Sequence, residues 1–264
     1  MPSSQVPVSP DLIALAHRLA DAARPIARQY FRKGVDVLDK SDASPVTQAD
    51  REIEAAMRDV ITAARPQDGI FGEEHGSERL DAEYVWVLDP IDGTKAFITG
   101  KPLFGTLIGL TQNRRPVLGI IDQPISEERW VGADGHGTTL NNIPVRTRSA
   151  SLEEAYLYAT GPDMFSEDAG TAAPFKRLSG SAKQALYGAD CYAYGLLAAG
   201  YVDLVCEALL KPYDYCAVVP VVQNAGGVVT DWNGAAVTLD TGDKILAAGA
   251  PDLHAAALSR LRAP

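Results

Sequence analysis

The feature that most constrains the fold of this chain is a change in the spacing of its apolar residues. Up to about residue 64, apolar positions recur at helical intervals in two stretches, one following Ser9 and Pro10 and one around Asp50. From about Ile70, short β-rich runs separated by turn residues predict a sheet of largely antiparallel strands. Later, strand-like and helix-like segments alternate, which indicates helices layered against a sheet. We therefore expect one α/β (α+β) unit with two halves, residues 1–150 and 151–264.

The clearest β-rich and helical segments give approximate boundaries for the expected elements. Strands are predicted over residues 84–88, 104–110, 117–121, 129–131, 155–159, 204–207, 228–230 and 245–248. In the second half, helices are predicted over residues 190–199, 215–225 and 252–261.

Composition and charge exclude several classes of protein. The 264 residues carry a formal net charge of −10 and 46% of them are hydrophobic, as in globular proteins. The acidic balance argues against nucleic acid as a partner, because phosphate-backbone binding needs clustered Lys and Arg. No apolar run approaches the roughly 20 residues that cross a bilayer, so we expect no membrane partner. The segment Met1 to Pro10 lacks the basic and apolar regions of a secretory signal, which predicts a cytoplasmic protein.

Several common functional motifs are missing or incomplete. Gly132, Gly135 and Gly137 have the wrong order for a dinucleotide-binding loop and no helical pattern follows, so we interpret them as a hairpin turn. The four histidines lack metal-binding spacing, and no Ser lies in a G-x-S-x-G motif. The three cysteines predict buried reduced thiols rather than a disulfide framework.

The most informative residues are acidic. In the segment Asp89-Pro90-Ile91-Asp92-Gly93-Thr94, we expect a strand to end at Asp89, because Pro90 bars further pairing and Gly93 permits a tight turn. The Asp89 and Asp92 carboxylates would then lie at one end of the sheet. By itself this pattern fits an Asx turn as well as a metal site. Glu73, which follows another strand-like run, adds a third carboxylate if the two strand ends are adjacent.

Three neighbouring carboxylates require a cation. Each close pair repels by roughly 4 kcal/mol at an effective dielectric constant near 20. Oxygen ligands without His or Cys favour a hard ion, Mg²⁺ before Ca²⁺ or Mn²⁺, and Mg²⁺ typically works with phosphate substrates. A bound metal would also supply the positive charge that an acidic protein needs to bind phosphate.

Four segments together resemble the inositol monophosphatase superfamily. They are residues 72–74 (GEE), 89–94 (DPIDGT), 211–214 (KPYD) and 224–231 (NAGGVVTD). The resemblance extends from about Leu12 to Leu258. It implies a layered αβαβα sandwich of the inositol monophosphatase and fructose-1,6-bisphosphatase type. It also implies a Mg²⁺-dependent, lithium-sensitive phosphatase that acts on a small phosphomonoester, and relatives of this kind are commonly homodimers.

The resemblance also implies roles for individual residues. One metal would be held by Glu73, Asp89 and the Ile91 carbonyl, a second by Asp89, Asp92 and Asp214, and a weaker third by Glu73 with Asp50 through water. Thr94 and Asp50 resemble the pair that orients and deprotonates the attacking water, beside Glu73. The implied substrate contacts are Asp92, Gly93, Thr94, Asp190, Glu207 and Asp214.

Within the superfamily, residues 187–194 (YGADCYAY) and 203–215 resemble the histidinol-phosphate phosphatase branch. This branch implies hydrolysis of L-histidinol phosphate in histidine biosynthesis by direct attack of a metal-activated water. Asp190 and Glu207 would place a carboxylate pair over the leaving group. If Asp190 is instead a helix N-cap, an inositol-1-phosphate or broad sugar-phosphate phosphatase is favoured. A non-catalytic metal-binding relative is a third possibility, against which the presence of Thr94 beside a full ligand set argues.

One departure concerns an arginine that many relatives place two or three residues before Gly188. Here these positions are Ala185 and Leu186. Arg177 and Lys183 are the candidates to replace its contact with the substrate.

Overall fold

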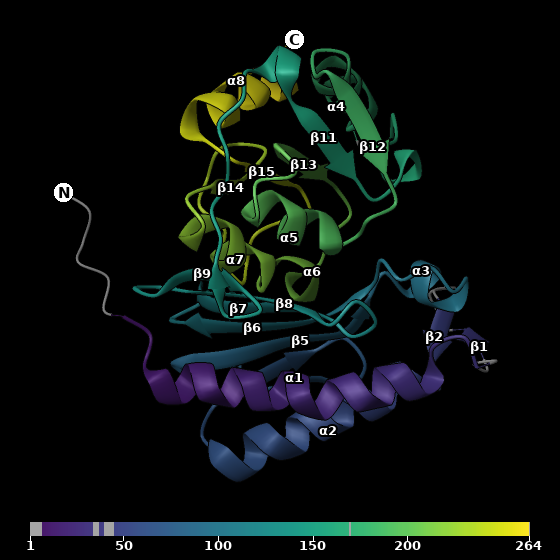
Figure 1. Cartoon of the computed structure of the whole chain (residues 1–264), viewed down its shortest axis with the longest axis vertical. Coiled ribbons are helices and arrows are strands. Elements are labelled where there is room, and N and C mark those ends of the chain that lie inside the picture. The colour runs from purple at the N-terminus through teal and green to yellow at the C-terminus, as the bar shows by residue number, and fades with distance from the viewer. Residues whose placement is uncertain (1–6, 34–36, 40–44, 169, 264) are drawn as a thin grey trace.

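The chain folds into five alternating layers of helices and sheets (Figure 1). The computed structural model describes residues 7–33, 37–39, 45–168 and 170–263. From one end of the molecule to the other, the layers are a helix pair, an eight-stranded sheet, a middle helical layer, a five-stranded sheet and a second helix pair. The predicted αβαβα sandwich is therefore confirmed. None of the helices among the described residues has the length and apolar character needed to cross a membrane.

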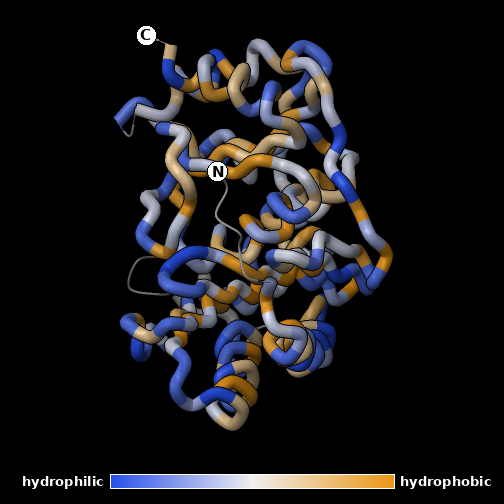
Figure 2. The backbone as a smooth tube through the Cα atoms, turned by 90° about the vertical axis from the view of Figure 1, so that its left-hand side faces the viewer, coloured by the Kyte–Doolittle hydropathy of each residue, from blue (hydrophilic) through white to orange (hydrophobic). Residues whose placement is uncertain are grey.

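The first layer consists of α1 (Pro10–Tyr30) and α2 (Gln48–Ala64). Helix α1 begins as the sequence predicts, with Pro10 in its first turn and the Ser9 hydroxyl accepting a hydrogen bond from the Asp11 amide at 3.3 Å. Hydrophobic and hydrophilic positions alternate around both helices (Figure 2). Their apolar faces pack on one side of the eight-stranded sheet in the first hydrophobic core.

The large sheet has the strand order β10-β9-β8-β7-β6-β5-β3-β4. Its pairs are antiparallel except for β3 with β5, which are parallel. The strands are β3 (Gly69–Gly72), β4 (Gly76–Glu78), β5 (Tyr84–Asp92), β6 (Gly105–Gln112), β7 (Arg115–Gln123), β8 (Glu128–Ala133), β9 (Gly137–Leu140) and β10 (Ile143–Pro144). A separate two-stranded sheet pairs β1 (Val37–Asp39) with β2 (Pro45–Thr47).

The second half of the chain builds the remaining layers. The middle helices are α5 (Tyr192–Ala198), α6 (Pro212–Tyr215) and α7 (Val218–Asn224). The second sheet has the order β12-β11-β13-β15-β14, with β11 (Tyr156–Ala159), β12 (Gln184–Tyr187), β13 (Leu204–Glu207), β14 (Val228–Asp231) and β15 (Ile245–Ala248). Its outer face is covered by α4 (Ala172–Ser179) and α8 (Pro251–Arg262). Short turns of 3₁₀ helix occur at η1 (Leu152–Glu154) and η2 (Pro162–Met164).

A row of glycines lets the middle layer lie directly on the first sheet. Gly109, Gly119 and Gly132 are cross-strand neighbours on β6, β7 and β8. A Cβ atom at any of the three would overlap or crowd the backbone of residues 216–221. The row continues on β9 with Thr138, whose hydroxyl donates to the Val221 carbonyl at 2.8 Å. The start of α7 is thereby seated against the sheet backbone.

The structure corrects several predicted boundaries. Strand β5 does not end at Asp89 but continues to Asp92, with a shift of register between the two residues. Pro90 cannot donate a hydrogen bond, but the irregularity accommodates it and its carbonyl accepts one from the Thr106 hydroxyl at 2.8 Å. The helix predicted over 215–225 corresponds to α7, whereas residue 215 is the last residue of the separate short helix α6. The sequence reasoning missed α4, β12 and the five-residue helix α3 (Thr94–Ile98).

Two smaller predictions are confirmed. The glycine motif at 132–137 forms the hairpin turn between β8 and β9, and Gly135 and Gly137 have φ angles of 83° and 77°. All three cysteines are free and buried.

Candidate active site

Three carboxylates converge between the two sheets. Asp89 and Asp92 lie on the last part of β5, and Asp214 lies in the first turn of α6. Each offers an oxygen that lies within 4.8 Å of the corresponding oxygens of the other two. The three carboxylates thus come from both halves of the chain. The packing of α7 on the glycine row fixes α6, and with it Asp214, beside β5.

Asp89 is the most enclosed of the three carboxylates. It is 2% exposed, and its Oδ1 atom has no hydrogen-bond partner among the described residues. Burial raises the pKa of Asp89 well above its ordinary value, and the negative charges of Glu73, Asp92 and Asp214 raise it further. A buried acidic oxygen with only like charges around it is an arrangement that a cation would stabilise.

Asp92 and Asp214 are each held by a backbone amide at the start of a helix. The Cys191 amide, at the N-terminus of α5, donates to Asp92 at 2.6 Å, and the Lys211 amide donates to Asp214 at 2.6 Å. Burial and then the charge of Asp190 raise the pKa of Asp92, while its hydrogen bonds to Cys191 lower it. Burial raises the pKa of Asp214 to about 7. The amides orient both carboxylates toward the shared centre.

Glu73 lies beside Asp89 because β3 and β5 are parallel neighbours. Gly72 pairs with Leu88, and the Glu73 amide donates to the Leu88 carbonyl at 3.3 Å. This confirms that the two strand ends are adjacent. The turn after β3 is anchored by the fully buried Glu54 of α2, which accepts hydrogen bonds from the amides of residues 74 and 75 at 2.7 and 3.1 Å. A Cβ atom at Gly72 would overlap the Glu54 carboxylate.

The other residues implied by the resemblance surround this centre. Asp50 is 2% exposed in the first turn of α2, and its charge contributes to the raised pKa of Asp89. Gly93 has a φ angle of 87°, a left-handed conformation that favours glycine and turns the chain from β5 into α3. The Thr94 hydroxyl donates to the Ile91 carbonyl at 3.1 Å. The donor set is therefore made of oxygen atoms alone.

These residues fit a divalent metal ion. The cluster offers carboxylate oxygens and no nitrogen or sulfur ligand, which suits a hard cation. The unpartnered Asp89 Oδ1 and the mutual electrostatic destabilisation of the buried carboxylates both call for positive charge at this point.

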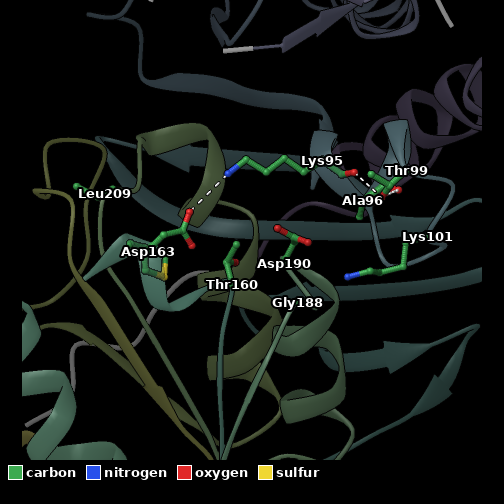
Figure 3. Close-up of a pocket in the computed structure, with 10 residues that line it drawn as sticks. Lys95, Ala96, Thr99, Lys101, Thr160, Asp163, Gly188, Asp190 and Leu209 are labelled. Atoms are coloured by element: carbon green, nitrogen blue, oxygen red, sulfur yellow. Dashed lines mark hydrogen bonds and ion pairs between the residues drawn. The ribbon is translucent and has the colours of Figure 1, made fainter. Parts of the chain in front are cut away.

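A cavity of about 380 Å³ reaches, through Asp190, the turn that follows Asp92. Figure 3 shows the residues that line it. Lys95 and Asp163 form an ion pair at 3.7 Å across it, from α3 to η2. The ten residues that line the cavity are Lys95, Ala96, Thr99, Lys101, Thr160, Asp163, Met164, Gly188, Asp190 and Leu209. Most of these side chains are polar or charged, as expected for a site that binds a small polar ligand.

Asp190 connects the cavity with the carboxylate cluster. A Cβ atom at Gly93 would lie 3.1 Å from the Asp190 carboxylate, so the side chain reaches the turn that follows Asp92. Burial raises the pKa of Asp190 to about 6, whereas nearby Lys101 and Lys95 and a hydrogen bond with Thr160 lower it. Asp190 has a φ angle of 45°, and helix α5 has Cys191 at its N-cap and no side-chain capping bond. Asp190 is therefore not the N-cap residue of α5, and helix capping does not explain why an aspartate stands at this position.

Glu207, paired with Asp190 in the sequence interpretation, does not line the cavity. It is 3% exposed, and its Oε1 accepts hydrogen bonds from the Thr160 amide at 3.0 Å and hydroxyl at 2.6 Å. Its Oε2 accepts one from the Tyr194 hydroxyl at 2.8 Å. Glu207 thus fixes the position of Thr160, and Thr160 in turn lines the cavity.

The two candidates for the missing arginine lie elsewhere. The Arg177 guanidinium donates to carbonyl groups at the C-terminal end of α8, including that of Ala263 at 2.6 Å. The Lys183 ammonium lies 4.7 Å from the centre of the Tyr156 ring. The cations that line the cavity are Lys95 and Lys101. The sequence reasoning did not select these lysines, although Lys95 directly follows the DPIDGT segment.

Comparisons with known proteins agree with this geometry. The inositol monophosphatase family model matches residues 10–263. The chain is 50% identical over 258 residues to the bifunctional phosphatase IMPL2, chloroplastic, of Arabidopsis thaliana, covering 94% of this chain and 74% of that protein. It is 34% identical over 234 residues to the histidinol-phosphatase of Chlorobaculum parvum, covering 88% and 90%. A solved inositol monophosphatase structure from Zymomonas mobilis has 46% identity and a TM-score of 0.88, covering 96% of this chain and 98% of the other.

The layered sandwich with a buried carboxylate cluster and an adjoining polar cavity defines a phosphatase of the metal-dependent class. The chain belongs to the inositol monophosphatase family.

Proposed function

We propose that this phosphatase hydrolyses L-histidinol phosphate with the help of Mg²⁺. The observation that carries the proposal is the position of Asp190, whose carboxylate lies in the cavity next to the turn that follows Asp92. Histidinol phosphate carries an ammonium group close to its ester, and a carboxylate at this position can form a charge-assisted hydrogen bond with it. Histidinol-phosphatases among the relatives, at 32 to 34% identity, support the same substrate.

The metal ligands in this proposal are Glu73, Asp89, Asp92, Asp214 and the Ile91 carbonyl. When bound, Mg²⁺ supplies the positive charge that polarises the phosphoryl group and acidifies a water molecule.

The protein's part in the reaction is to orient the water and the substrate. Because the Thr94 hydroxyl donates its proton to the Ile91 carbonyl, the Thr94 oxygen is left to accept a hydrogen bond from the attacking water. The buried Asp50 carboxylate would accept the second proton as the water attacks phosphorus. Gly93 lets the chain approach the phosphate closely, and Asp190 would hold the leaving group. The water attacks phosphorus directly, without a covalent phosphoenzyme, as the phosphorus–oxygen bond to the leaving group breaks and the leaving oxygen takes a proton from solvent water.

A second candidate substrate is inositol 1-phosphate or a related sugar phosphate. The negative charge of Asp190 is partly offset by Lys95 and Lys101, and Thr160 adds a hydroxyl to the same cavity. Such a site can also accept hydrogen bonds from neutral hydroxyl groups. The likeness to the Zymomonas mobilis inositol monophosphatase supports this alternative.

One variant assayed on both substrates distinguishes the two candidates. If Asp190 binds the ammonium group, Asp190→Asn should lower kcat/KM for histidinol phosphate by about 10- to 150-fold, the equivalent of a charge-assisted hydrogen bond. The same change should alter kcat/KM for inositol 1-phosphate less than about threefold. A matched loss on both substrates would contradict the ammonium contact and favour the broader phosphatase. The melting temperature of the variant shows whether either loss comes from a damaged fold.

Four further expectations accompany this proposal. We propose that the halves 1–150 and 151–264 act as a single phosphatase unit, since the cluster takes ligands from both. Lithium should inhibit the enzyme, and a flat lithium dose response would contradict this. Homodimer formation and a cytoplasmic location remain predictions from the sequence and its resemblance.

A further inference from the structure

Leu209 combines two unfavourable features on the wall of the cavity. Its φ angle of 64° lies in the left-handed region, which bulky side chains rarely occupy. Its side chain is also 56% exposed. Strained residues of this kind persist where the surrounding structure imposes them, and they concentrate at ligand-binding sites.

The packing of the chain does not account for a leucine at this position. Leu209 follows β13, and the next residue, Leu210, is fixed by an amide hydrogen bond to the Asp243 carbonyl at 3.0 Å. Leu210 packs against the apolar core between the sheets, whereas Leu209 belongs to none of the three core clusters of the described residues. Glycine or asparagine would satisfy the same backbone conformation at less strain. At 56% exposure the leucine side chain is only partly covered, so its burial offsets only part of the cost of this backbone conformation.

The position of Leu209 within the cavity indicates what could cover it. Figure 3 shows Leu209 and Lys101 toward opposite ends of the cavity, with Asp190 between them. Met164 and Ala96 are the other apolar side chains of the lining, whose remaining side chains are charged or polar. A ligand whose phosphate occupies the carboxylate cluster beside Asp190 can extend its carbon skeleton toward Leu209.

We propose that Leu209 is a specificity-determining residue that covers the carbon skeleton of the leaving group. It favours phosphomonoesters with an apolar or planar face over those with hydroxyl groups on every carbon. An apolar face gains free energy when it and Leu209 leave water, whereas a hydroxyl pressed against the leucine loses its hydrogen bonds to water. This proposal rests on the proposed phosphatase function, and it names the class of leaving group that the site prefers.

The test compares two small substrates that differ in polarity, n-propyl phosphate and glycerol 1-phosphate. In the Leu209→Asn variant, kcat/KM for n-propyl phosphate should fall by about 5- to 10-fold, as expected for losing part of a buried leucine contact. The loss should appear in KM, with kcat within about twofold, because the contact lies away from the reacting atoms. For glycerol 1-phosphate, kcat/KM should change less than about twofold.

Thermal unfolding provides a second readout that does not depend on catalysis. Asn tolerates the left-handed conformation, so Leu209→Asn should raise the melting temperature by about 2 to 4 °C. Leu209→Gly relieves the same strain but increases the entropy of the unfolded chain, so its rise should be smaller. The control is Tyr201→Ser, which removes an apolar side chain that is 68% exposed and outside the cavity lining. This control should leave the selectivity between the two phosphates unchanged.

Two results would overturn the proposal. One is an equal loss of kcat/KM on both phosphates in Leu209→Asn, and the other is unchanged selectivity despite a raised melting temperature. If the wild-type protein hydrolyses neither the two probes nor L-histidinol phosphate, the proposed function fails. Calorimetric titration of the wild type and Leu209→Asn with the two phosphates, with Mg²⁺ present, then decides the role of Leu209 separately. Weaker binding of n-propyl phosphate alone supports the role, and equal binding of both phosphates by both proteins rejects it.

Discussion

The backbone amide of Cys191 donates a 2.6 Å hydrogen bond to the carboxylate of Asp92, although 99 positions separate the two residues in the sequence. The bond joins the end of β5 to the start of α5 and so connects the two halves of the chain at the carboxylate cluster. It lowers the pKa of Asp92 against the effect of burial. The hydrogen bond from Cys191 that orients Asp92, a candidate metal ligand, therefore also fixes the segment that carries Asp190.

Replacement of Asp214 by Asn should abolish activity while the fold survives. The change removes an anionic ligand but keeps the size of the side chain and its place in the first turn of α6. In EDTA the variant should be more stable than the wild type, because close carboxylates repel by up to roughly 4 kcal/mol per pair. With Mg²⁺ present the order of stabilities should reverse. Urea denaturation with and without metal measures both effects, and full turnover by chelated wild-type enzyme would refute the metal assignment.

Thr94→Ala should lower kcat by about 10²- to 10⁴-fold and leave KM within a factor of about three. A hydroxyl that orients the attacking water acts mainly in the transition state. Thr94→Ser keeps the hydroxyl and is the matched control, expected to retain most of the activity. A rise in KM with little change in kcat would instead identify Thr94 as a substrate-binding residue.

Glu54→Gln should weaken metal binding although Glu54 is not a proposed ligand. Its two carboxylate oxygens accept the amide hydrogen bonds that hold the turn carrying Glu73. Because a glutamine has only one side-chain oxygen, its NH₂ group would face one of these donors in either orientation. Changes to residues that support metal ligands typically cost about 10- to 100-fold in metal affinity. Calorimetric titration with Mg²⁺ measures this loss. Glu78→Gln, at an exposed carboxylate that also contacts Arg58, is the control and should bind Mg²⁺ like the wild type.

Acidification should destabilise the protein in part through His17. Burial first, and then the charge of Arg129, lower the pKa of His17 below its ordinary value of 6.5. The unfolded chain therefore binds a proton at His17 more readily than the folded protein does, and the free energy of unfolding falls as pH drops below about 6.5. The contribution of one such group cannot exceed about 1.4 kcal/mol per pH unit.

His17→Gln isolates this contribution from that of the carboxylates. The raised pKa values of Asp89, Asp92 and Asp214 act in the opposite direction in metal-free protein, so the informative quantity is the difference between variant and wild type in one buffer series. Urea denaturation between pH 5.5 and 7.5 should show a smaller loss of stability on acidification in the variant. Parallel curves for the two proteins would exclude His17 as a source of the pH dependence.

The layer order could be predicted from the sequence because each layer has its own apolar spacing. The helical spacing up to residue 64 and the β-rich runs after Ile70 correspond to the first two layers. Two elements were harder to predict for different reasons: α3 has five residues, too few for a helical period to show, and β12 contains no β-branched residue. The end of β5 was placed too early because Pro90 removes a donor but does not prevent an irregular pairing.

The carboxylate cluster could be anticipated only in part. The turn residues predicted that Asp89 and Asp92 lie at one end of the sheet, Glu73 depended on the adjacency of two strand ends, and Asp214 came from the family resemblance. The cavity could not be predicted. Lys101, Thr160 and Leu209 come from three separate loops, and only the packing of the two sheets brings them together. The role of Glu207 could not be predicted either, because its hydrogen bonds with Thr160 and Tyr194 depend on contacts that the sequence does not reveal.

The row formed by Gly109, Gly119 and Gly132 has a mechanical consequence. Because the backbone of residues 216–221 rests in this row without intervening side chains, the two halves cannot slide or hinge there without backbone collisions. The distance between the carboxylates of β5 and α6 is thus set by main-chain contact rather than by adjustable side chains. At the rim of the cavity, by contrast, the ion pair of Lys95 and Asp163 is exposed and can break at little cost.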